Sequence, residues 1–301
     1  GPSERGAVRV DVEKSPVTAA EGPDQDYFGH QHVTVIEPPR MWQMLDVREL
    51  WAYRELLWVL TMRDVKVKYK QAVLGASWAI LRPLLTMIIF SVVFGRLAKM
   101  PSDGIPYPLF VYAGLLPWIF FSTAIGSSGQ SLVGSSQLVS KVYFPRLIIP
   151  VSSVGAGLID LLISTCLLLA LMLWYGVGWS INLLAAPILL IAVVFAALGV
   201  GSLLSALTVA YRDFQHITPF LVQIWMFVTP VIFPVSLVPE KWHWLLYMNP
   251  MSGLVEGFRS AFLGKPFDYP GLMISFATAL AFFVVGVIYF QKVERRFADI
   301  I

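Results

Sequence analysis

The ionisable residues of this 301-residue chain do not have the spacing of any familiar catalytic site. Its four histidines, His30, His32, His216 and His243, are scattered, and the single cysteine, Cys166, lies inside an apolar run. The sequence contains no GxxxxGKS/T phosphate-binding loop, no HExxH, no GxSxG and no CxxC. We therefore expect no metal site and no catalytic residue, and predict that the chain conducts a substrate rather than transforms it.

Asp160 differs from the other carboxylates because it lies near the middle of a long apolar run. An ionisable side chain inside a membrane span is rare and is commonly functional. Two interpretations stay open: a role in transport, or a hydrogen bond that only holds two helices together. No ladder of charged residues, such as a proton-coupled transporter needs, accompanies it, so we expect a partner to supply the energy.

A basic segment precedes the first apolar run. Apolar and aromatic residues recur there three and four positions apart, at Trp58, Met62, Val65, Tyr69 and Val73. The rest of the helix surface carries the basic residues Arg63, Lys66, Lys68 and Lys70. Asp64 is expected to pair with Lys68 one turn on. The pattern predicts an amphipathic helix on the cytoplasmic membrane surface, within residues 45–75. A solvated helix on a soluble core is the alternative, but no soluble core follows.

The composition explains what positions these residues. The chain is 57% hydrophobic and only 14% charged, which predicts an all-α protein that crosses a membrane several times. Six apolar runs approach the length of about 20 residues that a span needs. They cover about residues 79–97, 108–125, 147–175, 183–211, 217–238 and 271–290, and residues 76–301 are expected to form one transmembrane domain. The second run is the weakest, because it is short and contains Pro117. Residues 1–44, rich in Gly, Pro, Ser and charge, are predicted to be a mobile tail.

The loop charges predict the orientation of the chain. Lysine and arginine are more frequent in the loops that share a side with residues 48–70 than in the opposite loops. Both termini are therefore expected in the cytoplasm. The net charge of +3 could suggest a nucleic-acid partner, but the basic residues flank apolar runs, and we expect none.

A further helix is predicted between the fifth and sixth runs. One helical face there carries Met251, Leu254, Val255, Phe258 and Phe262, and Glu256 can pair with Arg259. The segment is too short and too charged to span, which predicts a re-entrant or interfacial external helix after the Asn249-Pro250 turn. The preceding aromatic residues Trp242, Trp244 and Tyr247 are predicted to be interface anchors, with contact to an external sugar as the alternative.

Aromatic rings could also line a passage, because they pack on the apolar faces of sugars as well as on other side chains. Those near polar or small neighbours are the candidates for such a wall. They are Tyr112, Trp118, Phe120 and Phe121 in the second run and Trp225 in the fifth.

Four segments occur in the order and spacing seen in ABC-2 type permeases. They are RELLWVLTMRDVKVKYKQAVLGASWAILRPLL, KVYFPRLIIPVSS at residues 141–153, AYRDFQHI at 210–217 and NPMSGLVEGFRSAFLG at 249–264. The chain resembles in particular the membrane subunits of exporters that move O-antigen, capsule or teichoic acid. The resemblance covers about residues 45–301.

The resemblance implies how such a chain works. Two copies would form a passage through the bacterial cytoplasmic (inner) membrane for a lipid-linked polysaccharide. Two copies of a separate ATPase subunit would bind ATP and Mg and hydrolyse the ATP, so this chain itself would need no cofactor. A permease of the same superfamily for drugs or small lipids is the main alternative. A membrane-embedded glycosyltransferase is a remoter one, because no paired extramembrane carboxylates are present.

The resemblance also implies which residues have roles. The ATPase would dock on the cytoplasmic loop at about residues 127–146, where the expected contacts are Gln137, Lys141, Tyr143, Phe144, Pro145 and Arg146. A second cytoplasmic motif, Tyr211, Arg212 and Asp213, would contact the partner or stabilise the bundle. The interfacial helix would lie near the cytoplasmic mouth of the passage, through Trp58, Arg63, Lys66, Lys68, Tyr69 and Lys70. Its basic residues would contact anionic lipid headgroups or the pyrophosphate of the substrate.

Overall fold

The computed structural model describes residues 51–70, 75, 77–141 and 144–294. Within these ranges every regular element is a helix and no strand occurs, so the predicted all-α class is confirmed there. The predicted tail at residues 1–44 lies outside the described residues.

Five helical stretches in the described ranges are long and apolar enough to cross a membrane. They are α3 (Ser77–Phe90) continued by the π-helix η1 (Ser91–Leu97), α4 (Tyr107–Gly134), α6 (Ile148–Trp174), the 3-10 turn η2 (Ile181–Ala185) continued by α7 (Ala186–Ala210), and α11 (Tyr269–Glu294). The chain is therefore a multi-pass membrane protein.

The second apolar run differs from its prediction. It was expected to be short and interrupted at Pro117, yet α4 is a continuous helix of 28 residues that extends past Ile125 to Gly134. A proline is tolerated inside a membrane helix where neighbouring groups satisfy the backbone that it leaves unpaired. Pro117 lies among buried residues at the centre of the bundle, where neighbouring helices pack on all sides of it.

The fifth run is shorter than predicted. It forms α8 (Phe214–Val228), whose 15 residues extend about 22 Å, less than the hydrocarbon thickness of about 30 Å. The chain then leaves the helix at Thr229, and the following residues 229–232 are buried without being helical. Short elements follow: η3 (Val235–Leu237), η4 (Glu240–Trp242), α9 (His243–Tyr247) and α10 (Pro250–Leu263).

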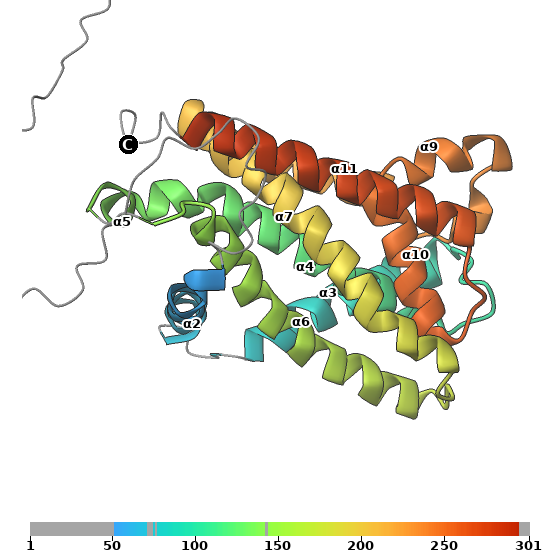
Figure 1. Cartoon of the computed structure of the whole chain (residues 1–301). Coiled ribbons are helices and arrows are strands. Elements are labelled where there is room, and N and C mark those ends of the chain that lie inside the picture. Colours follow the sequence, from blue (N-terminus) through green and yellow to red (C-terminus); the bar gives the residue numbers. More distant parts are fainter. Residues whose placement is uncertain (1–50, 71–74, 76, 142–143, 295–301) are drawn as a thin grey trace, which may run out of the picture. The chain divides into compact units, whose positions relative to one another are not determined.

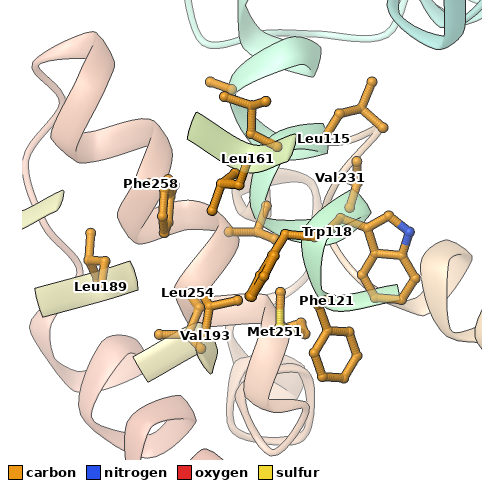
Figure 2. Packing of buried hydrophobic residues seen from close by; sticks show 14 of the residues in the cluster. Leu115, Trp118, Phe121, Leu161, Leu189, Val193, Val231, Met251, Leu254 and Phe258 are labelled. Carbon is orange, nitrogen blue, oxygen red and sulfur yellow. The ribbon is translucent and has the colours of Figure 1, made fainter. Parts of the chain in front are cut away.

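α4 occupies the centre of the bundle. It contacts α3, α6, α7, α8 and α10, and α6 and α7 lie beside it in Figure 1. Its most apolar stretch is 78% buried, against 11% for α3 with η1, which places α4 inside the bundle and α3 at its edge. Figure 2 shows its side chains Leu115, Trp118 and Phe121 packed in the core with Val231 and Leu254.

The closest helix contact joins α7 to α11. A Cβ atom on Gly286 would overlap the carbonyl of Gly199, and a Cβ on Gly199 would overlap the backbone of Phe283. Small residues let membrane helices approach closely, so that packing and dispersion replace the hydrophobic effect as the source of association. These two glycines therefore set the spacing of α7 and α11.

The predicted interfacial segment contains a helix, α2 (Arg54–Lys70), which packs on α6. Leu60 and Thr61 are its buried residues, whereas Trp58, from the predicted apolar stripe, is 64% exposed. The predicted pair between Asp64 and Lys68 is wrong: Asp64 pairs with its neighbour Arg63 at 2.9 Å, because Lys68 turns toward α6 instead. The position of α2 on a membrane surface stays a prediction.

Replacing Gly286 by alanine is expected to destabilise the bundle. The added methyl would push α11 away from α7, and overpacking of this kind costs about 1–3 kcal/mol. Thermal unfolding of the detergent-solubilised protein measures the effect. Gly126→Ala in α4 is the matched control, because a Cβ there meets nothing within 4 Å. Equal unfolding temperatures of the two variants would contradict the close contact.

Candidate functional site

The segment between α4 and α6 was predicted to dock an ATPase. It contains the short helix α5 (Ser136–Lys141), on which Gln137 and Lys141 are exposed, whereas Tyr143 lies outside the described residues. Phe144 is only 5% exposed and packs with Leu147 and Phe290 in a hydrophobic cluster. Lys141 is therefore accessible at the surface and its contact with an ATPase stays a prediction, while Phe144 holds the segment to the bundle.

Arg146 has partners within the chain. Its backbone N–H donates to the carboxylate of Glu294 at 3.1 Å, and its guanidinium donates to the carbonyl of Glu294 at 2.6 Å. A cation beside the last carbonyls of a helix is favourable. Arg146 thus ties the beginning of α6 to the end of α11, and Pro145 before it is half-buried. Contact of either residue with an ATPase stays a prediction.

The second predicted motif lies at the same end of the bundle. Tyr211, Arg212 and Asp213 connect α7 to α8 and are exposed. One hydrophobic cluster contains Val209, just before this motif, together with Phe144 and other residues near the segment before α6. The two motifs that the sequence placed on one side of the membrane are therefore brought to one end of the structure.

Asp160 contacts two side chains of α2. Lys68 forms an ion pair with its carboxylate, and the Tyr69 hydroxyl donates a hydrogen bond to it. Burial raises the pKa of Tyr69, and the hydrogen bond to Asp160 raises it further, so the hydroxyl keeps the proton that it donates. Of the two interpretations of Asp160, a bond between helices is the one that the structure contains.

The other basic residues of α2 point elsewhere. A cavity of about 340 Å³ lies beside the Asp160 contact, and α2, α3, α4 and α6 all contribute to its wall. Its lining includes Lys68, Tyr69, Trp78, Arg82, Phe120 and Asp160. Trp58, Arg63, Lys66 and Lys70 instead line a separate groove of about 690 Å³ along α2. The predicted interfacial set is therefore divided between two faces of one helix.

The predicted pore aromatics pack inside a single chain. Tyr112, Trp118, Phe120 and Phe121 are at most 3% exposed, because α4, which carries them, is the central helix. Phe121 meets Trp225 edge to face at 5.1 Å between ring centroids, and Trp225 donates to the Asn249 side chain. The structure brings all five close to the core, and their contact with a substrate stays a prediction.

Arg259 is the residue whose role sequence reasoning missed. Its predicted ion pair with Glu256 is confirmed at 3.1 Å, but the side chain is completely buried. Its guanidinium donates to the carbonyls of Phe110 at 3.1 Å and Pro230 at 2.6 Å, and to that of Val231. It also lies 3.8 Å from the centre of the Phe110 ring.

These acceptors explain the burial of Arg259. Pro230 and Val231 follow the end of α8 and are buried, so their carbonyls have no helical partner and need a donor from elsewhere in the protein. α10 brings Arg259 to them because every residue of this helix except Glu256 is buried. A Cβ on Gly114 would lie only 2.6 Å from the guanidinium, so α4 leaves room for it. The sequence signal was weak: two prolines, Pro230 and Pro234, close together in an apolar run.

A polar cluster, defined here as Asp103, Ser236 and Lys265, lies at the other end of the bundle. Lys265 pairs with Asp103 at 2.8 Å, and the Ser236 hydroxyl donates to Asp103 at 2.9 Å. Burial raises the pKa of Asp103, but the hydrogen bonds from Lys265 and Ser236 outweigh it and leave the pKa below its ordinary value. The cluster joins three connections: α3 to α4, α8 to α9 and α10 to α11.

The three predicted external anchors divide between the surface and the interior. Trp242 and Trp244 are 48% and 57% exposed, as an anchor at the membrane surface requires. Tyr247 is buried, and its hydroxyl donates to Asp268 at 2.5 Å. Tyr247 therefore holds α9 to the beginning of α11.

Comparison with known proteins identifies the family. Residues 55–263 match the ABC-2 type transporter family, so the chain belongs to that family. It is 31% identical over 257 residues to the O-antigen export system permease protein RfbA of Myxococcus xanthus, covering 84% of this chain and 98% of the relative. An RfbA permease of Klebsiella pneumoniae is 30% identical over 82% of this chain and 95% of its own length. The polysialic acid transport protein KpsM of Escherichia coli is 26% identical over 67% and 79%.

Replacing Arg259 by methionine is expected to destabilise the protein strongly. The change would leave Glu256 and the carbonyls of Pro230 and Val231 without their cation, and breaking a buried pair costs about 3–5 kcal/mol. Thermal unfolding and the abundance of inserted protein are the measurements.

Lys265→Met is the matched control, since it removes a basic residue from a pair whose side chains are 16% and 34% exposed, and its loss should therefore cost less than that of the fully buried Arg259. Arg259→Lys, which keeps the charge but loses the fork of donors, should lie between the two. An Arg259→Met protein as stable as Lys265→Met would contradict the assigned role.

Proposed function

We propose that this chain is the transmembrane subunit of an ABC exporter that moves a lipid-linked, O-antigen-like polysaccharide across the cytoplasmic membrane of a bacterium. The observation that carries the proposal is similarity over nearly the whole length of two O-antigen export permeases. A polysialic acid transport protein, similar over a shorter stretch, supports a polysaccharide as the class of substrate. The chain is a transport subunit and carries out no chemistry on the polysaccharide.

A separate ATPase subunit supplies the energy in this proposal, and ATP and Mg bind there. The sequence has no phosphate-binding loop of its own. Exposed charged residues at one end of the bundle, Lys141, Arg212 and Asp213, offer a polar surface to which such a subunit can bind. The segment that carries Lys141 continues directly into α6, so that a push on it reaches a membrane-spanning helix.

In this proposal the fifth apolar run also crosses the membrane, which brings the number of crossings from five to six. α8 begins beside Tyr211, at the end that carries Lys141, and the chain after it places Ser236 against Asp103 at the opposite end. The buried backbone that follows α8, held by Arg259, covers the distance that the short helix leaves. Six crossings put both ends of the domain on one side, and the loop charges favour the cytoplasm for it. α10 is then a re-entrant helix that enters from the external side.

Two copies of this chain would enclose the passage. α3 and α8 keep large apolar side chains exposed, among them Ile88, Ile89, Phe220, Leu221 and Ile224. Surfaces of this kind face lipid or another chain, and a twelve-helix dimer would place part of them at the contact between the copies. The basic groove along α2 would meet anionic lipid headgroups or the pyrophosphate of the substrate.

Deletion of this chain in its host is expected to leave the polysaccharide inside the cell. The cell surface should lose the polymer, while lipid-linked glycan accumulates in the cytoplasmic fraction, because synthesis continues without export. Glycan analysis of the surface and of extracted lipids measures both. A normal surface with altered drug sensitivity would instead indicate a permease for small molecules.

Reversing the charge of Lys141 is expected to weaken binding of the ATPase. Lys141→Glu should lower co-purification of that subunit and polysaccharide export together, while insertion of the chain is unchanged. Lys241→Glu is the matched control, because that exposed lysine lies on the external side in this proposal. Full co-purification and export with Lys141→Glu would remove the docking assignment.

A further inference from the structure

α2 is attached to α6 at three successive positions. A Cβ on Gly155 would lie 3.2 Å from the Thr61 hydroxyl, so the helices nearly touch there. The Ser152 hydroxyl donates to Asp64 at 3.4 Å. The third position is the contact of Asp160 with Lys68 and Tyr69.

Of these three contacts, the one at Asp160 would cost the most free energy to lose if α2 separated from α6. Asp160 lies twelve residues into α6, about 18 Å along the helix, and its side chain is only 20% exposed. A partly buried carboxylate is unfavourable unless it is paired and hydrogen-bonded. Its partners in the described structure both come from α2, so moving α2 away would leave the carboxylate uncompensated.

α6 also connects this contact to the segment that begins the helix. Residues 144–147 lead directly into α6, and Phe144 and Leu147 pack in the same hydrophobic cluster as Leu60 of α2. A continuous helix can move as a rigid body when one of its ends is displaced. A movement imposed on the segment before α6 would therefore reach Asp160 and, through it, the end of α2.

The cavity of about 340 Å³ described above lies at the edge of the unit formed by α2 and α6. It lies between the Asp160 contact and α3, where Trp78 and Arg82 form the opposite wall. The first membrane-spanning helix is therefore less tightly packed against α2 than α6 is. Gly75, between α2 and α3, has a φ of 47°, which turns the chain sharply at that point.

We propose that Asp160 is a positioning residue that fastens α2 to α6, so that both helices move as one rigid unit when the ATPase displaces the segment before α6. The proposal rests on the proposed docking of the ATPase. It assigns Asp160 no contact with the polysaccharide and no proton to transfer. Its function is to make α2, with its exposed basic groove, follow the movement of α6 at the cytoplasmic side.

A disulfide between α2 and α6 tests whether the two helices must separate during export. Thr61→Cys with Gly155→Cys, in a Cys166→Ser background, places the two Cβ atoms about 3.9 Å apart, within the range of about 3.5–4.5 Å for disulfides. After oxidation with copper–phenanthroline, export is expected to continue at the rate of the reduced protein. Loss of export on oxidation, restored by reductant, would overturn the proposal.

Asp160→Asn tests the fastening itself. The variant should lower export about tenfold, within the usual range of coupling between sites, while the ATPase remains bound and hydrolyses ATP. Forming the disulfide between the cysteines introduced at positions 61 and 155 of the same protein should restore most of the export, because the covalent bond replaces the ion pair. Glu55→Gln is the control and should change export less than twofold, because Glu55 is an exposed carboxylate of α2 that takes no part in the attachment to α6 described above.

The outcomes separate this proposal from the docking assignment. Normal export with Asp160→Asn, or a defect that the formed disulfide does not restore, would overturn the fastening role. If Lys141→Glu has no effect while the disulfide restores export to Asp160→Asn, the docking assignment fails and the fastening stands. Co-purification of the ATPase with each variant shows which step has been lost.

Discussion

Buried backbone carbonyls that leave a helix must find donors within the protein, and the half of this bundle that contains α10 is arranged around that requirement. α8 ends after 15 residues, and the carbonyls of Pro230 and Val231 are satisfied by Arg259 from α10. α10 can deliver the guanidinium only by lying inside the bundle, against α4 and α11. Three features therefore depend on one another: the break after α8, the burial of α10, and the space beside Gly114 that admits the guanidinium.

The same cost of unpaired polar groups acts at the end of the bundle that contains α2 and the beginning of α6. Asp160 is tolerable within α6 because Lys68 and Tyr69 reach it from α2. Arg146 likewise joins the beginning of α6 to the end of α11. In a bundle whose helices gain little from the hydrophobic effect among themselves, such polar contacts and the close approach of Gly199 to Gly286 determine which helices stay together. α3, α8 and α11 are among the helices that keep large apolar side chains exposed, and these surfaces are available to lipid or to another chain.

Sequence reasoning was accurate where a pattern is local. Apolar runs located α3, α6, α7 and α11 to within a few residues, and the face from Met251 to Phe262 located α10. It was less accurate where neighbours decide. Pro117 suggested a weak span, yet α4 is the central helix, because surrounding helices stabilise it. Lys68 had two carboxylates within reach, and only packing against α6 selected Asp160 over Asp64.

The sequence by itself determined the class of the protein, its membrane character, its family motifs and the side on which its basic residues gather, because these depend on composition and short-range order. The tertiary structure alone decided which polar groups are partners. Arg259 meets carbonyls of residues about 30 and 150 positions away, and Asp160 meets side chains about 90 positions away, as the hydrogen bonds show. The physical reason is that an unpaired charge or carbonyl inside a membrane is satisfied by whatever donor folding brings near, and no local pattern records which donor that is.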